Sequence, residues 1–195
     1  LLVVTALFGA SLVRVLNVQR GFTADRVLAV ELSLPATRYA TEQVRQPVYD
    51  RLLGAVHTLP GVRAVTTTSV LPLRGPIGTN SILPEGKNWT MSEMPIANFR
   101  FVAPEFFRTL GLDVKRGRSF TDAERDAQRP APALISESTA ARMWPGEDPI
   151  GKRFSRPLPN EQGFEVVGVV GEARMTSLDE APPLMVYIPY WWRSR

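Results

Sequence analysis

Residues 164–170, Phe-Glu-Val-Val-Gly-Val-Val, form an almost unbroken apolar run that contains four valines. Branched side chains of this kind pack well on a pleated surface, so the run predicts a strand buried in the middle of a sheet. The apolar runs at 96–102 and 184–188 predict two more strands. These three runs make a β-sheet the expected core of the protein.

Shorter elements are expected between these runs. Ser136 is placed to cap a helix that ends at Met143 or Trp144, because its hydroxyl can accept a hydrogen bond from a free N–H group of the first turn. Thr121 and Glu124 have the spacing of a capping box, which predicts a brief helical turn. The other expected elements are strands at 112–116 and 133–135, a short helix at 104–110, and at most one short strand, near 81–83, in the Pro- and Gly-rich stretch 71–95.

The first half of the chain predicts a β-α-β unit. The apolar stretches at 27–34 and 62–70 are each typical of a strand, and the crossover between them should be right-handed. Between them, apolar residues recur every three or four positions over 41–59, which predicts an amphipathic helix with its first residue as the N-cap. Pro47 would either kink this helix or shift its start to about Gln46. Strands and helices mix without strict alternation, so the expected fold class is α+β, in a two-lobed domain.

The N-terminus is apolar from residue 1 to residue 13, before Arg14 brings the first charge. Thirteen helical residues would span about 20 Å, less than the ~30 Å of a bilayer core. We expect 1–13 to be the end of a transmembrane helix whose first turns lie upstream, with a buried N-terminal helix as the alternative. Apolar and polar residues then alternate up to Arg20, which predicts an amphipathic helical stalk that ends at Gly21.

Composition narrows the chemistry that the chain can perform. The 195 residues include no cysteine and a single histidine, His57, which excludes disulfides, thiol nucleophiles and most zinc sites. The formal net charge is +4, but the 23 lysines and arginines are scattered, without stacking aromatic residues between them. We therefore expect a solvated basic surface and no nucleic-acid binding.

Local motifs predict no catalytic, cofactor or metal site. The stretch 146–153 has P-loop spacing, but Arg153 replaces the hydroxyl residue and Pro149 removes a backbone N–H, so a surface turn leading into a strand is the better interpretation. The alternating acids at 122–126 lack the rest of a calcium loop and fit the first turn of a helix. His57 lies at the edge of the apolar stripe, and the chain has no G-x-S-x-G elbow to supply a serine.

An ordered series of short motifs carries more information than any one of them. In chain order the series is Gly21-Phe22, Leu34-Pro35, Arg38-Tyr39, Leu59-Pro60-Gly61-Val62, Leu71-Pro72-Leu73-Arg74-Gly75, and then the stretches 104–111, 116–122, 145–152, 166–171 and 186–190. This series resembles the extracytoplasmic core domain of MacB-like ABC transporter permeases, of the FtsX/MacB type, and specifically the acidobacterial duplicated orphan permeases. The resemblance covers nearly the whole chain, from the expected exit from the membrane to Tyr190.

The resemblance implies a part that transmits motion and performs no chemistry. In such transporters a separate cytoplasmic ABC ATPase subunit moves the membrane helices, and stalks pass the motion to the extracytoplasmic domains. It implies a bacterial inner-membrane protein with a second permease copy as a further partner, and no cofactor. Arg14, Arg20 and Arg26 would favour a cytoplasmic location by the positive-inside rule, but that rule is weak for long translocated domains.

The resemblance also implies a division of the chain and a set of positions. Residues 1–20 would be the membrane helix and stalk, 21–190 the extracytoplasmic core domain, and 191–195 a truncated tail before a further strand, a helix and three membrane helices. The residues expected to transmit motion along the stalk are Ser11, Arg14, Asn17 and Arg20. The expected structural positions of the family motifs are Gly61, Pro72, Gly75, Gly111, Gly117, Arg118, Gly146, Pro149, Gly151 and Gly168.

Two other functions are compatible with the sequence. One is a membrane-tethered extracytoplasmic binding or sensor domain without transport. The other is a hydrolase anchored by its N-terminus, which the missing catalytic residues disfavour. The sequence does not specify a cargo.

Overall fold

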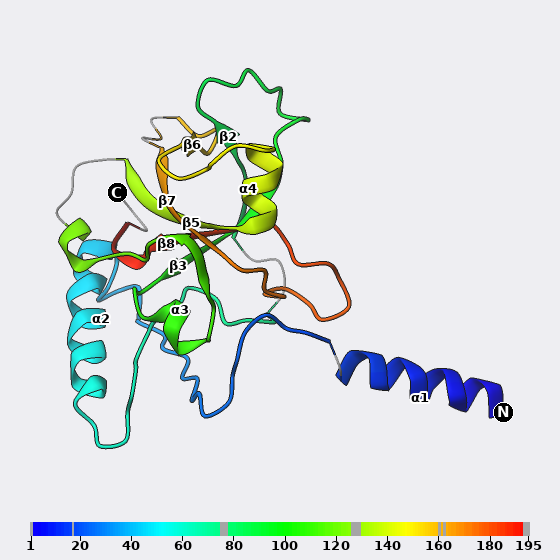
Figure 1. Ribbon diagram of the computed structural model, residues 1–195. Helices are drawn as coiled ribbons and strands as arrows, with labels where there is room; N and C mark the ends of the chain where they lie inside the picture. Colours follow the sequence, from blue (N-terminus) through cyan, green and yellow to red (C-terminus); the bar gives the residue numbers. More distant parts are fainter. Residues whose placement is uncertain are drawn as a thin grey trace.

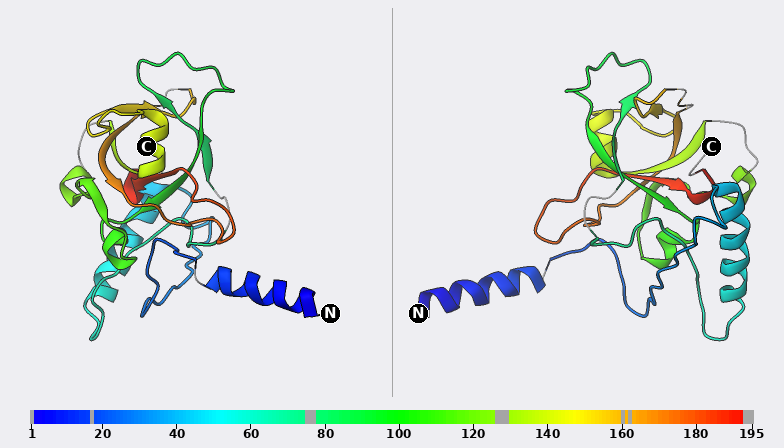
Figure 2. Two further views of the ribbon diagram at one scale, coloured as in Figure 1. Left: turned by 45° about the vertical axis from the view of Figure 1, so that its right-hand side comes forward. Right: turned by 180° about the vertical axis from the view of Figure 1, so that it is seen from behind.

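The computed structural model describes residues 2–16, 18–74, 78–125, 130–159, 161 and 163–192, and Figure 1 shows their arrangement. In chain order the elements are α1 (Leu2–Leu16), α2 (Glu42–His57), β1 (Thr79–Ser81), β2 (Leu83–Pro84), β3 (Ile96–Val102), α3 (Phe106–Thr109), β4 (Val114–Gly117), η1 (Asp122–Arg125), β5 (Ala131–Ser136), α4 (Glu137–Met143), β6 (Arg153–Ser155), β7 (Phe164–Val170), β8 (Met185–Pro189) and η2 (Tyr190–Trp192). These strands belong to one sheet, and α1 projects away from it (Figures 1 and 2). The expected α+β class is confirmed.

β7 is the strand around which the sheet is organised. β5 pairs with it in parallel on one edge, while β6 and β4 pair antiparallel, one after the other, along its other edge. β8 runs antiparallel to β5 and parallel to β3. The connection between the parallel strands β5 and β7 contains α4 and β6, so one parallel crossover of this fold lies at 131–170, and the connection from β3 to β8 is another.

One continuous piece of chain forms both ends of the sheet. The strand order is β1-β3-β8-β5-β7-β6-β2, and only Ile82 separates β1 from β2. The sheet therefore closes on itself as a distorted barrel. Ile82 is fully buried where the chain turns from one partner strand to the other, and its N–H donates to the carbonyl of Pro95 at 3.0 Å.

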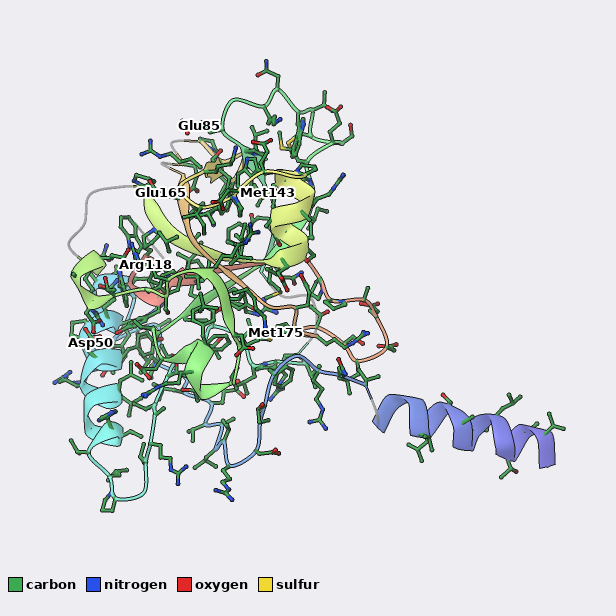
Figure 3. All side chains as sticks on the ribbon, in the orientation of Figure 1. Asp50, Glu85, Arg118, Met143, Glu165 and Met175 are labelled. Atoms are coloured by element: carbon green, nitrogen blue, oxygen red, sulfur yellow. The ribbon has the colours of Figure 1, made fainter. Side chains whose placement is uncertain are left out.

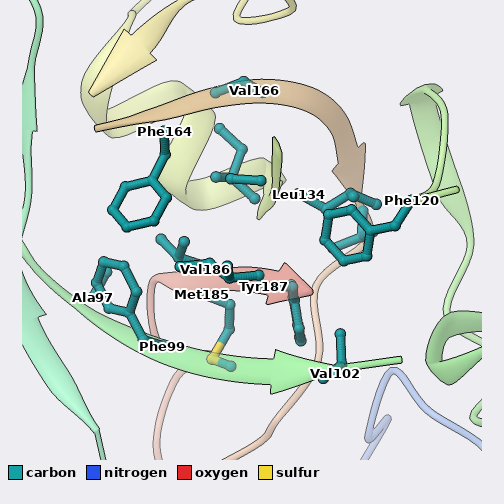
Figure 4. Packing of buried hydrophobic residues seen from close by; sticks show 14 of the residues in the cluster. Ala97, Phe99, Val102, Phe120, Leu134, Phe164, Val166, Met185, Val186 and Tyr187 are labelled. Atoms are coloured by element: carbon teal, nitrogen blue, oxygen red, sulfur yellow. The ribbon is translucent and has the colours of Figure 1, made fainter. Parts of the chain in front are cut away.

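The hydrophobic core fills the inside of this barrel (Figure 4). At one end the ring of Phe164 packs against the rings of Phe154 and Phe99, with centroids 5.2 and 6.0 Å apart. At the other end Phe107 contacts Tyr187 edge-on at 5.3 Å. Aromatic pairs at these separations add stability beyond the area that they bury.

The long apolar runs and the local capping signals are confirmed. The strands expected at 96–102 and 164–170 are β3 and β7 with the same bounds, and 184–188 is β8 shifted by one residue. Ser136 caps α4, because its Oγ accepts a hydrogen bond from the N–H of Thr139. Of the capping box at 121–124, the half in which the Thr121 N–H donates to Glu124 is present, at 2.8 Å. The stretch 71–95 forms two short strands, β1 and β2, where at most one was expected.

The β-α-β unit expected at 27–70 is wrong. Residues 27–34 are extended but belong to no strand, and Leu28 is 88% exposed. Residues 62–70 form only an isolated bridge, from Thr68 to Val102. Residues 67–69 meet only the last residues of β3, beyond the stretch that β1 covers, and residues 27–34 have no strand of the described chain beside them with which to form a ladder.

Helix α2 is the middle part of that expected unit, and it does form. It begins at Glu42, so a start near Gln46 is wrong, and Pro47 lies inside it. Thr41 has the extended backbone of an N-cap, but its side chain makes no capping hydrogen bond. The turn at Pro60 and Gly61 follows its end, as expected.

Helix α1 is shorter than the sequence predicts. A helical stalk was expected up to Gly21, but α1 ends at Leu16 and residues 18–20 are not helical. Among the residues that the structure describes, no helix combines the length and the apolar character needed to cross a membrane.

The burial pattern makes a direct prediction for stability. Leu134 is fully buried on β5, whereas Leu28 is 88% exposed. Leu134→Ala should lower the free energy of unfolding by about 2–5 kcal/mol, through lost apolar burial and the cavity left behind. Leu28→Ala should change it by less than about 0.5 kcal/mol. Denaturant unfolding checks the pair, and equal losses at the two positions would contradict the observed core.

Candidate functional site at the stalk junction

The chain that leaves α1 joins the domain through two backbone hydrogen bonds. The carbonyl of Arg20 accepts one from the N–H of Arg174 at 2.8 Å, and the N–H of Thr23 donates the other to the carbonyl of Leu110 at 2.7 Å. Phe22, between them, packs half-buried against the core. We call residues 20–23, 110–111 and 171–175 the stalk junction.

Gly21 brings the two sides of the junction into close contact. Its backbone has φ +75°, in the left-handed region that favours glycine. A Cβ atom at this position would lie 1.9 Å from the carbonyl oxygen of Glu172 and 2.9 Å from the Cα of Ala173. Only a residue without a side chain fits against this backbone, so Gly21 is a structural requirement of the junction.

Segment 171–175 connects the junction to three other parts of the domain. The N–H of Gly171 donates to the carbonyl of Asp113, just before β4, at 3.0 Å. The carbonyl of Met175 accepts from the N–H of Leu73 at 2.8 Å. Met175 itself is buried and lies on the side of the domain from which α1 projects (Figure 3). The carboxylate of Glu172 reaches Ser138 on α4. A displacement of the stalk would therefore reach several elements through this one segment.

The structure brings one of the four expected stalk residues into the junction. Arg20 lies there, and it acts through its backbone carbonyl, while its side chain is exposed. Ser11 is exposed on α1, and Arg14 belongs to the same helix. Asn17 lies outside the described residues. Residues 18–20 lie outside α1, and the bond from Arg174 attaches them to the domain in a non-helical conformation.

The candidate chemical motifs do not assemble into a site. Residues 146–152 form turns that lead into β6, with Lys152 paired to Glu147. Asp122 lies in η1 and pairs with Arg125 at 3.0 Å. His57 is exposed at the end of α2. Within the described part of the chain there is no group of three or more metal-ligating side chains.

Comparison with known proteins identifies the family. Residues 1–195 match the model of the MacB-like periplasmic core domain. The chain belongs to this family. It is therefore an extracytoplasmic domain of the kind that MacB-like permeases carry, and the family is one of periplasmic domains and not of enzymes.

Individual relatives are more distant. The macrolide export ATP-binding/permease protein MacB of Mannheimia succiniciproducens is 28% identical over 93 residues, which are 48% of this chain and 14% of that protein. The periplasmic region of MacB from Actinobacillus actinomycetemcomitans has 23% identity and a TM-score of 0.49, with 71% of this chain and 53% of that one covered. The extracellular domain of the noncanonic ABC-type transporter YknZ from Gram-positive bacteria has 18% identity and a TM-score of 0.48, with 72% and 62% covered. The chain thus spans only part of each relative.

Several motif positions of this MacB-like domain have a conformational explanation. Gly168 is buried in β7, where a Cβ would lie 2.4 Å from the carbonyl oxygen of Arg118. Pro149 is buried in the turn before β6, and Pro72 lies half-buried in the turn at 72–73. Gly75 lies outside the described residues. The positions with positive φ are Gly61, Gly111, Gly117, Gly146 and Gly151.

Arg118 fastens the chain between β4 and η1. Its N–H donates to the carbonyl of Val167 at 3.0 Å, and its guanidinium pairs with Glu124 at 2.7 Å. The hydrogen bond to Glu124 raises the pKa of Arg118 above its usual value. The side chain is exposed, so this pair has little energetic weight.

Arg125 holds α2 to the end of the sheet. Its guanidinium lies over the ring of Trp191 at 4.4 Å, pairs with Asp50 of α2 at 3.1 Å, and donates to the hydroxyl of Tyr190 at 2.7 Å. The Tyr190 hydroxyl in turn donates to Asp50, which Figure 3 labels on α2. Gln46, one turn earlier on α2, donates to the carbonyl of Trp191 at 2.7 Å. The attachment of α2 is therefore polar and aromatic.

This cluster predicts a loss of stability in alkali. Burial raises the pKa of Tyr190 from 10.0 to about 12, and the hydrogen bond to Asp50 adds to the shift. Because the folded state favours the neutral phenol, the contribution is complete below pH 10 and is lost as the pH rises from 10 to 12. We expect the free energy of unfolding to fall over this range, and to fall less steeply in Tyr190→Phe. Burial also raises the pKa of Tyr187, and this shift should account for the fall in the free energy of unfolding that remains in Tyr190→Phe. An identical slope in the variant would contradict the prediction.

Sequence reasoning missed half of the junction. Arg20 and Gly21 are candidates from the sequence, but segment 171–175, which binds them, falls between two expected strands. The only local signal near this segment is the end of the apolar run 164–170. Glu172 follows it as a single acidic residue in a loop, and no sequence pattern predicts a contact for such a residue.

Proposed function

We propose that the chain is the extracytoplasmic domain of an ABC transporter permease, in which it couples ATP-driven motion of the membrane helices to substrate export or partner engagement. A cytoplasmic ABC ATPase subunit would supply the energy, and a second permease copy would complete the transporter. The protein would lie in the bacterial inner membrane, with residues after about 20 outside the cytoplasm. ATP hydrolysis would belong to the separate subunit.

The observation that supports this function best is the stalk junction. A domain that is only anchored to the membrane can be joined to its anchor by a flexible segment, whereas a domain that receives motion from the membrane helices needs a rigid connection to them. Here the incoming chain is held by backbone hydrogen bonds on both sides of Gly21, and Gly21 lies in backbone contact with Glu172. Such a joint would carry a pull on residues 18–20 directly into the domain.

The test inserts a flexible glycine segment just before the stalk junction. In the full permease, reconstituted in lipid with the ABC ATPase that co-purifies with it, a dye is attached to Arg142→Cys, which is exposed on α4; the chain described here has no other cysteine. Energy transfer to acceptor lipids of the outer leaflet then reports how far the domain lies from the membrane. ATP should change the transfer, and three glycines inserted between Gln19 and Arg20 should remove at least two thirds of that change.

A matched insertion after Gly61, in an exposed turn, should leave the change intact. An equal ATP response with and without the three glycines between Gln19 and Arg20 would contradict coupling through the junction. No ATP response in any variant would favour a membrane-tethered binding or sensor domain without transport. A cytoplasm-specific reporter fused after Arg195 should be inactive, and full activity would overturn the extracytoplasmic location.

A further inference from the structure

Glu172 belongs both to the stalk junction and to the support of α4. Its carbonyl oxygen lies against Gly21, and Arg174, two residues further on, binds Arg20. Its carboxylate points the other way: Oε1 accepts a hydrogen bond from the N–H of Ser138, and Oε2 accepts one from the Ser138 hydroxyl at 3.1 Å. One side chain thus spans the distance between the incoming chain and the first turn of α4.

The first turn of α4 depends on this carboxylate. The first N–H groups of a helix have no partner within the helix and need one from outside. Ser136 accepts from the N–H of Thr139, and Glu172 accepts from the N–H of Ser138. On its other side the turn is fixed to β8, where the N–H of Met185 donates to the Thr139 hydroxyl at 2.9 Å. α4 is therefore held between the sheet and the junction segment.

The other end of α4 borders a surface depression. Trp144 directly follows the last residue of α4, Met143, which Figure 3 labels. The depression has a volume of about 400 Å³ and is lined by Glu85, Gly86, Trp144, Gly151, Lys152 and Arg153. A rotation or shift of α4 would change its shape, because α4 is a short helix that ends in one of its walls.

We propose that Glu172 is a positioning residue that transmits displacement of the stalk to α4, and through α4 to the depression beside Trp144. This inference rests on the proposed function and deepens it, since it names the residue through which the motion leaves the junction. A displacement of Arg20 would pull on the backbone of Arg174 through their hydrogen bond, and a displacement of Gly21 toward the domain would press on the backbone of Glu172. The two hydrogen bonds to Ser138 make α4 follow the same displacement.

The test perturbs the junction and observes α4. The N–H of Arg174 donates to the carbonyl of Arg20, so Arg20→Cys and Arg174→Cys place two thiols on adjacent backbone segments, and thiol labelling verifies that oxidation joins them in a reversible bridge. Hydrogen exchange of residues 138–143 is then measured in the full chain, oxidised and reduced. Oxidation should slow exchange in α4 at least threefold when residue 172 is glutamate, and should have no effect in Glu172→Ala.

Glu172→Gln is the conservative variant, because its amide oxygen can still accept from the Ser138 N–H, and it should retain the response. Exchange in α2, which is attached to the domain at Trp191 and Arg125 and not at α4, is the internal control and should not change on oxidation. An equal response in Glu172→Ala, or no response with glutamate present, would overturn the proposal. The measurement needs neither ATP nor cargo, so a failure of the proposed transport function would appear separately, in the energy-transfer experiment.

Discussion

Gly117→Ala is expected to lower the free energy of unfolding by more than about 3 kcal/mol, the upper range for one residue held in a disfavoured backbone conformation. Gly117 has φ +73°, where any L-residue with a side chain is strained. A Cβ there would also lie 2.2 Å from the carbonyl oxygen of Val167 and 2.9 Å from the Cα of Gly168. Because these atoms belong to the backbone of β7, they cannot rotate away, and β4 would have to separate from the sheet.

Gly146→Ala is the matched control. Gly146 has nearly the same backbone conformation, φ +74°, but a Cβ added there would meet no atom within 4 Å. Only the conformational cost of about 1–2 kcal/mol should appear there. Thermal and denaturant unfolding of the two variants separate the strain common to both from the collision specific to Gly117. Similar losses in both would show that the approach of β4 to β7 is not the cause.

Gly21→Ala should open the stalk junction while the barrel stays folded. The new Cβ would lie 1.9 Å from the carbonyl oxygen of Glu172, so the chain must move away from segment 172–174. The N–H of Arg174 then loses the carbonyl of Arg20. We expect its amide hydrogen exchange to accelerate at least tenfold, which corresponds to about 1.4 kcal/mol of lost protection.

Two controls show whether the effect of Gly21→Ala is confined to the stalk junction. Amides of β5 and β7 should keep their protection, because the junction lies outside the barrel ladder. Gly61→Ala has the same kind of strain, at φ +84° with no atom within 4 Å of the added carbon, and should leave the exchange of Arg174 unchanged. An unchanged rate in Gly21→Ala would mean that the backbone contact does not hold the stalk.

The elements that could be predicted are those whose signal lies within the element itself. The run 164–170 is apolar except for Glu165, which suits a strand largely buried on both faces, and it is β7. Ser136 is followed by its own helix, so the N-cap needs no information from elsewhere. The resemblance implied structural positions at Gly117 and Gly151 without a backbone conformation, and both have a positive φ in the structure.

The elements that failed were those that need a partner. Residues 27–34 have the composition of a strand, but a strand needs a neighbouring strand and a buried face, and here Leu28 and Val30 remain exposed with no described strand beside them. The stretch up to Arg20 has a helical pattern, but α1 ends at Leu16, and residues 20–23 are bound to distant segments of the domain instead. Local propensities are worth a few tenths of a kcal/mol per residue, which tertiary contacts readily override.

The sequence by itself determined the buried strands, the capped helix α4 and the resemblance to MacB-like domains, because apolar runs, caps and motif order are properties of consecutive residues. Only the tertiary structure decided the closure of the barrel at Ile82 and the stalk junction at Gly21, since both join segments that lie far apart in the chain. It also decided the role of Glu172, an ordinary loop acid until folding places it between the stalk and Ser138. Hydrogen bonds between distant segments depend on three-dimensional position, and no pattern of neighbouring residues encodes them.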